Sequence, residues 1–348
     1  MPMKCDELPL PSHFDPGKTG DIFRVPYYDR AREALEWARS HRIGPSSEDR
    51  FRIALLAIDV QNTFCIPGFE LYVAGPSGNG AVEDTARLCR FIYRNLQSIT
   101  EIVPTMDTHR AMQIFHPLFF INSEGAHPDP MTVIPAEDLR NGIWRASPHA
   151  AALTHGGDYG ELQQHVLHYA EALRRGGKYE LMIWPYHAML GGIGHALVPA
   201  FEEALFFHGV CRSAQASFEL KGGNALTENY SVLSPEIREG PGGEPLAEKN
   251  RELITRLLGF DAVIIAGEAK SHCVAWTVDD LLGEIEARDA SLAGKVYLLE
   301  DCTSPVVVPG VADFSHEADK AFSRFRKAGM HLVSSGEPMA SWPGIPGG

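Results

Sequence analysis

Residues 51–59 read Phe-Arg-Ile-Ala-Leu-Leu-Ala-Ile-Asp, an unbroken apolar run that ends in a carboxylate. A short apolar run without polar alternation is typical of a strand that is buried on both faces of a parallel sheet. Later runs have the same texture, namely ITEIVPT (99–105), YELMIWP (179–185), QASFELK (215–221), FDAVIIAGE (260–268), KVYLLED (295–301) and MHLVSS (330–335). We therefore expect a set of buried strands that begins at residue 51.

Helical patterns separate several of these runs. They cover 82–96, 246–258, 274–285 and 312–327. Strands that alternate with helices along a chain favour a parallel sheet with helices on both of its faces. The sequence therefore predicts an α/β fold.

The chain outside this alternation divides into three further segments. Residues 1–50 predict an N-terminal arm with one helix over 28–40, and residues 51–334 predict the main domain. The insertion 117–180 interrupts that domain with a Pro-rich loop and one helix over 161–174. Since both of its ends lie beside candidate site residues, we expect it to form a lid or pocket wall. Residues 335–348 predict a flexible tail.

Composition narrows the function classes. The chain has 348 residues and a formal net charge of −14, which disfavours nucleic acid and anionic membrane surfaces as partners. No apolar run approaches the roughly 20 residues of a membrane helix. The six cysteines are scattered and include no C-x-x-C pair. This cysteine usage fits a reducing compartment, so we expect a cytoplasmic protein. With nucleic acid and membranes disfavoured as partners, we expect it to act on a small molecule.

Chemically reactive side chains follow the apolar runs. In an open parallel sheet, ligands bind beyond the carboxyl ends of the strands. The residues found there are Asp59 after the first run, Asp107 and His109 after the second, His187 after the third, Lys221 at the end of the fourth and Cys273 after the fifth. Together they predict a site at one edge of the sheet.

Cys273 is the candidate nucleophile. The spacing of Val274, Val278 and Leu281 predicts a helix that begins near Cys273. A thiol in the first turn of a helix has a lowered pKa, and the N–H groups of such a turn can stabilise an oxyanion. The alternative is a small buried side chain without chemistry.

A metal site is the second hypothesis. Asp107 and His109 are two residues apart, so an extended segment places them on the same face. His187 supplies a third ligand, and His116 is either a further ligand or a loop histidine. One aspartate and two histidines suit zinc, iron or manganese. Lys221 is a candidate site residue if it lies beside Asp59 and Cys273, because a cation at that place favours the ionised forms of the carboxylate and the thiol.

These residues resemble the motifs of the isochorismatase-like cysteine hydrolases, and within them those of the nicotinamidases. The match covers residues 51–334 apart from the insertion. The matching segments are Asp59-Val60-Gln61-Asn62-x-Phe64, Asp107-x-His109, Trp184-Pro185-x-His187, Lys221-Gly222 followed by Glu228-Asn229-Tyr230-Ser231, and Gly267-x-Ala269 through Cys273-Val274. The chain departs from the family pattern at Ala188, at Lys270-Ser271 and in the length of its insertion.

The resemblance implies a three-layer α/β/α sandwich with a six-stranded parallel sheet, in a homo-oligomer. It implies Asp59, Lys221 and Cys273 as catalytic residues. It also implies a cis peptide before Ala269, whose N–H would join that of Cys273 in the oxyanion hole. Phe64 and Trp184 match residues that sandwich a pyridine ring, and the metal matches one that binds the ring nitrogen, with zinc expected first.

The leading functional prediction is hydrolysis of nicotinamide to nicotinate and ammonia through a Cys273 thioester, a reaction of pyridine nucleotide salvage. A second hypothesis keeps the chemistry and changes the substrate to another small amide, such as a maleamate, ureido or carbamoyl compound. A third is a binding protein that keeps the fold without catalysis. A substrate panel separates the first two, and the presence of any hydrolysis separates both from the third.

Overall fold

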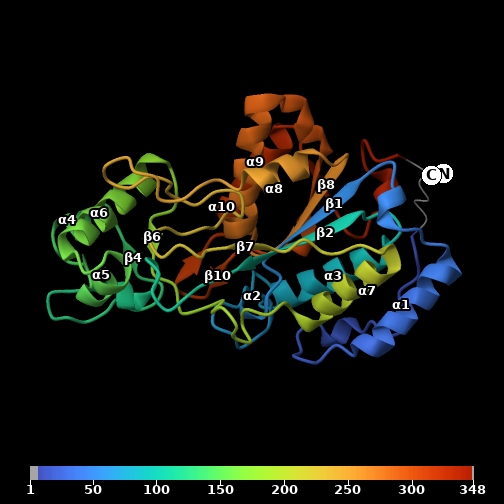
Figure 1. Ribbon diagram of the computed structural model, residues 1–348, viewed down its shortest axis with the longest axis horizontal. Coiled ribbons are helices and arrows are strands. Elements are labelled where there is room, and N and C mark those ends of the chain that lie inside the picture. The colour runs from blue at the N-terminus through green and yellow to red at the C-terminus, as the bar shows by residue number, and fades with distance from the viewer. Residues whose placement is uncertain (1–6, 347–348) are drawn as a thin grey trace.

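A six-stranded parallel sheet forms the centre of the molecule in the computed structural model, which describes residues 7–346 (Figure 1). Its strands are β1 (Ile53–Ile58), β2 (Glu101–Asp107), β7 (Glu219–Lys221), β8 (Ala262–Gly267), β9 (Val296–Leu299) and β12 (His331–Val333). They lie in the order β12-β9-β8-β1-β2-β7, and every pairing is parallel. The predicted six-stranded parallel sheet is confirmed.

Strand β1 is the centre of this sheet and the point where the strand order reverses. All six of its residues are buried, as its apolar run predicts. Leu56 lies opposite Val103 of β2 on one side and Ile265 of β8 on the other. The chain builds the sheet first in one direction from β1 and then in the other, which leaves a crevice at the carboxyl ends of β1 and β8.

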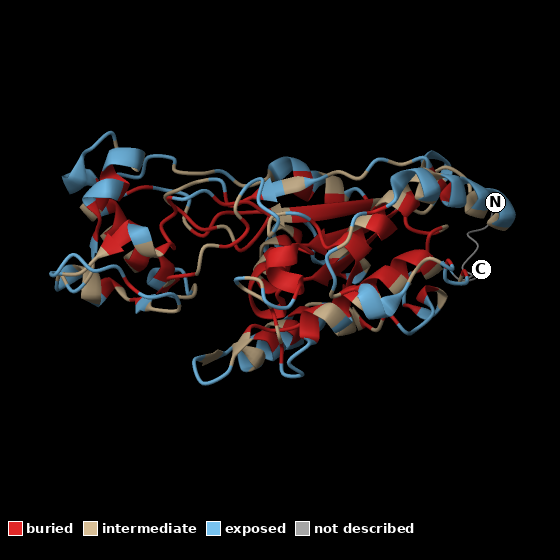
Figure 2. Ribbon diagram, turned by 90° about the horizontal axis from the view of Figure 1, so that it is seen from below, coloured by how far each residue is buried: buried red, intermediate tan, exposed pale blue. Residues whose placement is uncertain are grey.

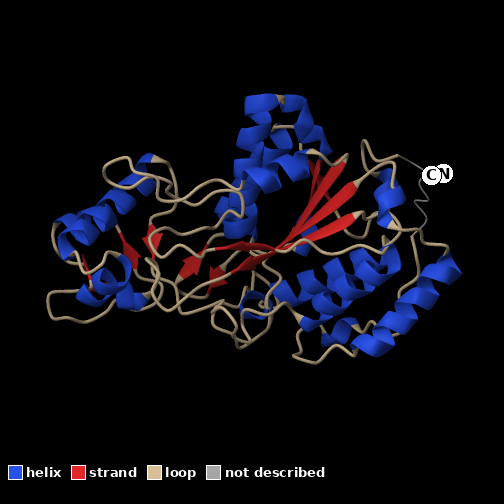
Figure 3. Ribbon diagram, viewed as in Figure 1, coloured by secondary structure: helices blue, strands red, loops and turns tan. Residues whose placement is uncertain are grey.

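Helices cover both faces of the sheet (Figure 3). Ile53, Leu55 and Ala57 of β1 belong to the apolar cluster that contains residues of α3 (Gly80–Arg94) and α7 (Pro199–Arg212), and α1 (Tyr27–His41) packs on α7. The alternate β1 residues belong to the cluster that contains residues of α8 (Arg251–Leu258), α9 (Ala275–Arg288) and α10 (Ser315–Lys327). The three-layer α/β/α architecture is therefore confirmed.

One apolar run lies outside the central sheet. Residues 179–185 form only β6 (Leu181–Met182), which pairs antiparallel with β4 (Val133–Ile134). The place beside β2 is taken by β7. The backbone N–H groups of Ile183 and Trp184 donate instead to Thr132 O and Phe115 O. The prediction of a sheet strand over 179–185 was wrong for this reason.

The insertion 117–180 folds into a lobe beyond the carboxyl ends of the strands (Figure 1). It contains α4 (Ala136–Arg140), α5 (Pro148–Thr154), α6 (Tyr159–Arg175) and a ladder of β3 (Phe120–Ile121) with β5 (Arg145–Ala146). The sequence predicted α6 alone, because helices of five and seven residues are too short to show a period. Buried residues lie both in this lobe and in the layers around the sheet (Figure 2).

The remaining described elements are short. They are α2 (Asn62–Cys65) and the ladder of β10 (Val307–Val308) with β11 (Ala312–Asp313). The other short elements are helical segments of three to six residues at Pro16–Lys18, Ser46–Glu48, Pro117–Phe119, Lys270–Val274, Ala290–Lys295, Glu300–Cys302 and Met339–Ser341. Because β11 takes residues 312–313, α10 begins later than the predicted helix over 312–327. Within residues 7–346, no helix is long and apolar enough to cross a membrane.

The segment expected to be a flexible tail is packed in its described part. Met339, Trp342 and Ile345 are buried, and the Trp342 ring stacks on Phe91 and Tyr297 at centroid distances of 5.7 and 5.6 Å. Three apolar side chains within seven residues explain this packing. Residues 1–6 of the arm and 347–348 lie outside the described part of the chain. The division into arm and main domain stays a prediction.

Candidate active site

Four buried polar side chains from four strand ends meet at the crevice. Asp59 follows β1, Asp107 ends β2, Lys221 ends β7, and Cys273 lies in the π-helical turn Lys270–Val274 after β8. The structure therefore brings together the residues that the strand-end rule selected.

Lys221 contacts the other three side chains of this group. Its Nζ lies 2.9 Å from Asp59 Oδ2, 2.9 Å from Asp107 Oδ1 and 3.6 Å from Cys273 Sγ, and it donates to Asn229 O at 3.0 Å. Burial alone would lower the pKa of Lys221, but the carboxylates of Asp107 and Asp59 outweigh it and raise that pKa well above its usual value. Lys221 is a buried cation at neutral pH.

Asp59 is fixed by Thr105 on the adjacent strand. Thr105 Oγ1 donates to Asp59 Oδ1 at 2.5 Å and accepts from the Asp59 backbone N–H at 3.0 Å. Asp59 adopts a left-handed backbone conformation with φ 49°. Burial raises the pKa of Asp59, while the positive charge of Lys221 opposes the increase. A carboxylate in this environment can both accept and return a proton.

Cys273 is a protonated thiol in the resting site. Complete burial raises its pKa well above the usual value, and Lys221 only partly opposes this. Its Sγ is within hydrogen-bonding range of Asp59. The sequence predicted a lowered pKa from the helix that follows; burial, together with the carboxylates of Asp59 and Asp107, acts in the opposite direction and raises it. The thiol therefore needs a base, and Asp59 is beside it.

The turn before Cys273 has the backbone geometry that the resemblance implied. The peptide bond between Glu268 and Ala269 is cis, and the backbone N–H groups of His272 and Val274 both donate to Ala269 O. Gly267 has φ 112°, and a Cβ added there would lie 2.0 Å from Ile58 O. Only glycine fits this close approach of β8 to β1. The oxyanion role of the Ala269 and Cys273 N–H groups stays a prediction.

Three buried histidines form the candidate metal centre. Ligand atoms of His109, His116 and His187 all lie within 4.8 Å of one another. His109 Nδ1 and both ring nitrogens of His116 make no hydrogen bond among the described residues. His187 Nδ1 lies 2.7 Å from Pro185 O, which orients the ring so that Nε2 is the nitrogen on the side of Asp107. Unpaired buried imidazole nitrogens that converge in this way fit a divalent metal ion.

Asp107 adjoins the histidines without belonging to the group of three. Its Oδ1 lies 2.9 Å from His109 Nε2, and its Oδ2 lies 3.5 Å from His187 Nε2. Gln61 holds this strand end, because its side chain accepts from the Asp107 N–H and donates to the Asp107 carbonyl. The sequence named Asp107, His109 and His187 as ligands with His116 as an extra. In the structure, His116 belongs to the same group of candidate ligands as His109 and His187.

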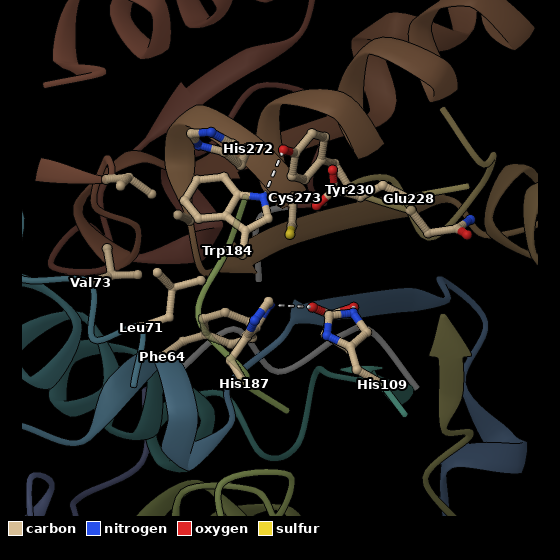
Figure 4. Close-up of a pocket in the computed structure, with 14 residues that line it drawn as sticks. Phe64, Leu71, Val73, His109, Trp184, His187, Glu228, Tyr230, His272 and Cys273 are labelled. Carbon is tan, nitrogen blue, oxygen red and sulfur yellow. Dashed lines mark hydrogen bonds and ion pairs between the residues drawn. The ribbon is translucent and has the colours of Figure 1, made fainter. Parts of the chain in front are cut away.

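A small cavity opens beside these groups (Figure 4). The side chains that line it are mostly apolar or aromatic, namely Phe64, Leu71, Val73, Asp107, His109, Trp184, His187, Glu228, Asn229, Tyr230, Ala269, His272, Cys273 and Val306. Phe64 and Trp184 both line it, and the Trp184 N–H donates to Tyr230 Oη at 3.1 Å. A mostly apolar and aromatic lining with a few polar groups suits a small organic substrate.

Sequence reasoning missed several residues of the cavity wall. Leu71, Val73 and Val306 come from loops that carry no recognisable signal. His272 lies next to the nucleophile, where its ring meets Trp184 edge-on at a centroid distance of 5.6 Å. Burial lowers the pKa of His272 to about 3, so it lines the cavity as a neutral ring. Its place in the nucleophile turn was the signal that could have identified it.

The insertion hydrogen-bonds to segments that line the cavity but does not line the cavity itself. None of the lining residues lies within 117–180, so the segment is not a direct wall of this cavity. Tyr169 Oη accepts from the Glu228 N–H at 3.2 Å, and Tyr179 Oη donates to Ser271 O at 3.0 Å. The lid expectation is therefore replaced by support of two lining segments.

This chain is similar to known proteins in its three-dimensional structure but not detectably in its sequence. No family model matches the chain, and no curated protein matches it by sequence. Among solved structures, it is similar to a yeast nicotinamidase (19% identity, 81% of this chain and 99% of that chain, TM-score 0.49). It is also similar to an Acinetobacter baumanii nicotinamidase (19% identity, 83% and 98%, TM-score 0.48). A third is a Pyrococcus horikoshii pyrazinamidase in complex with zinc (17% identity, 81% and 99%, TM-score 0.44). At these scores the likeness assigns no activity to this chain.

Proposed function

We propose that this chain is a metal-containing cysteine amidohydrolase that hydrolyses a small carboxamide, with nicotinamide as the first candidate substrate. The observation that carries the proposal is the meeting of Asp59, Lys221 and Cys273 at the reversal point of the sheet, beside a cavity. A nucleophile, a base and a cation in mutual contact are what acyl transfer requires.

The proposed reaction begins with a proton transfer. Asp59 accepts the thiol proton as Cys273 Sγ attacks the carbonyl carbon of the amide. The N–H groups of Ala269 and Cys273 would stabilise the oxyanion, each such donor being worth roughly 3 kcal/mol. As the C–N bond breaks, Asp59 returns the proton to the nitrogen and ammonia leaves. Water then cleaves the thioester, and Asp59 again accepts and passes on a proton, so that the acid and the thiol are released.

The proposed metal would be held by His109, His116 and His187, with Asp107 beside them. Zinc is the first candidate, since nitrogen-rich sites with an open position are common for zinc, and iron and manganese are the alternatives. Bound there, the ion would act as a Lewis acid that orients a substrate atom. Burial lowers the pKa of His116 to about 3, so its ring is neutral and able to bind a metal.

Nicotinamide is favoured over aliphatic amides by the cavity lining. Phe64 and Trp184 are large aromatic surfaces on a small cavity, and planar rings gain dispersion energy against such surfaces. A maleamate or a ureido compound would leave this surface without an aromatic partner. Assembly as a homo-oligomer and a cytoplasmic location stay predictions from the sequence.

The test is metal analysis together with ammonia release from a panel of amides. The panel would contain nicotinamide, pyrazinamide, maleamate and an N-carbamoyl amino acid, with the enzyme loaded in turn with zinc, iron and manganese. Faster ammonia release from the two aromatic amides is expected. Preference for an aliphatic amide would change the substrate class, and no release from any amide with any metal would refute hydrolysis.

A further inference from the structure

A second pair of buried carboxyl groups lies behind the nucleophile turn. Glu268 directly follows β8 and is joined to Ala269 by the cis peptide bond. Its side chain is 1% exposed. Glu268 Oε2 accepts from the Ser304 N–H at 3.2 Å, whereas Oε1 makes no hydrogen bond to a conventional donor in residues 7–346.

Asp84 of α3 is the facing carboxyl group. Its Oδ1 accepts from Arg87 Nη2 at 2.6 Å, and its Oδ2, like Glu268 Oε1, has no conventional donor among the described residues. The two carboxyl groups are within hydrogen-bonding range of each other. Both border a narrow internal gap together with Val60, Cys65, Thr85, Leu88, Gly267 and Cys302. Apart from the Ser304 side chain, which also contributes a hydrogen bond to Asp84, the contact between the two carboxyl groups is what remains among the described residues to satisfy the unpaired oxygens.

One proton resolves this arrangement. Two buried carboxylates in contact repel each other, and each unpaired oxygen carries the cost of its lost hydration. A proton on Glu268 turns the two acceptors into one O–H···O bond. Burial raises the pKa of Glu268 well above its usual value, and the Asp84 charge adds to this. Burial also raises the pKa of Asp84, but Ser304 and Arg87 favour its ionised form. The proton therefore belongs on Glu268.

The groups that surround the pair do not compete for this proton at neutral pH. Burial raises the pKa of the Cys65 and Cys302 thiols well above the usual value, and it raises the pKa of Tyr72 to about 12. The facing cation is Arg87, whose Nη1 also lies 3.9 Å from Glu83 and whose Nε donates to Asp301 O.

The pair is linked to the nucleophile turn through Ser304. The Ser304 N–H donates to Glu268 Oε2, and Ser304 O accepts from the Lys270 N–H at 2.8 Å. Lys270 is the first residue of the turn that contains Cys273. A change at Glu268 would therefore shift the turn from both sides, through its own backbone and through Ser304.

We propose that Glu268 is a positioning residue whose protonated carboxyl donates to Asp84, and that the chain of contacts from Arg87 through Asp84 and Glu268 holds Ala269 and Cys273 in place. The kinetic part of this inference rests on the proposed amidohydrolase function, whereas the shared proton does not.

Infrared difference spectroscopy tests the shared proton without a substrate. At pH 7 the spectrum of the wild type minus that of Glu268→Gln should contain the carbonyl band of a protonated carboxylic acid. Glu203→Gln serves as the control, because Glu203 is a buried carboxylate of α7 that is paired with Arg30 and should give no such band. Absence of the band in the Glu268→Gln difference would overturn the inference, whatever the activity.

Kinetics test the positioning role. Glu268→Leu removes the donor and should lower kcat about tenfold or more, with KM and metal content nearly unchanged. Glu268→Gln can still donate to Asp84 and accept from Ser304, so it should recover most of the lost kcat. Equal kcat for the leucine and glutamine variants would refute positioning. If the wild type hydrolyses no amide, the proposed function fails, and the infrared band still decides whether the proton is shared.

Discussion

The amine of Lys221 lies 3.6 Å from the sulfur of Cys273, although 52 residues and two intervening strands separate them. Strands in a sheet are about 4.8 Å apart, so a residue at the end of edge strand β7 needs a long side chain to reach the end of β8. Asp107 lies opposite Lys221 in the β2–β7 register and accompanies it into the site. The geometry explains why a lysine occupies this strand end.

Lys221→Met should lower kcat by about 100-fold or more and also reduce stability. The variant leaves Asp59 and Asp107 as two buried carboxylates without a cation, and breaking a buried pair costs roughly 3–5 kcal/mol. Ammonia release and thermal unfolding measure the two effects. Lys249→Met, which removes a partly exposed pair with Glu284, is the control and should change both little. Wild-type kcat in Lys221→Met would show that the cation has no part in catalysis.

His116→Ala should lower bound metal as much as His109→Ala or His187→Ala. All three rings belong to one group of buried ligands, so each removal leaves two histidines. Elemental analysis of each purified variant gives the stoichiometry. His149→Ala is the control, because that histidine is exposed and outside the group. Full metal content in His116→Ala, with loss in the other two, would restore the ligand set expected from sequence.

Trp184→Leu should raise KM for nicotinamide about tenfold and leave KM for a small aliphatic amide nearly unchanged. An aromatic pair is worth about 0.5–1.5 kcal/mol beyond the apolar area that it buries, and only an aromatic substrate can form it. Steady-state kinetics with the two amides measure the difference. An equal change in both KM values would indicate general damage to the cavity.

Folding stability should fall as the pH decreases from about 6.5 towards 4, in part because of His208. Burial lowers the pKa of this histidine from 6.5 to about 4, and its Nε2 lies 2.9 Å from Ile99 O. The unfolded chain therefore binds the proton first, so the stability present above pH 6.5 is lost below it, by up to about 3 kcal/mol for this group. Urea unfolding at several pH values should show a flatter profile for His208→Gln. Parallel profiles would exclude His208 as a source of the pH dependence.

Much of the central layer was predictable from sequence because burial on both faces leaves an unbroken apolar run. The residues after 51–58, 99–105 and 260–267 could be placed at one edge, since parallel strands share a direction. The run over 179–185 has the same composition but pairs elsewhere. Whether β6 or β7 pairs with β2 depends on contacts between residues far apart in the sequence, which no local pattern contains.

Part of the cavity wall and the protonation states could not be predicted from the sequence. Glu228 and Tyr230 follow the lysine segment in a long loop, and only its packing on Tyr169 places them at the cavity. The helix that follows Cys273 was visible as a period, but complete burial of the thiol was not, and burial decides its pKa. Short-range patterns thus predicted which residues meet, and long-range packing decided their charge.

The most direct test of the account is ammonia release by metal-loaded Cys273→Ala beside the wild type, with the amide that the wild type hydrolyses fastest. Circular dichroism and elemental analysis establish that fold and metal content are retained in the variant. We predict that release falls to the rate of the buffer alone, because no other described side chain can form the acyl intermediate at that position. Release at a rate near that of the wild type, with the fold and metal intact, would contradict the assignment of Cys273 as the nucleophile.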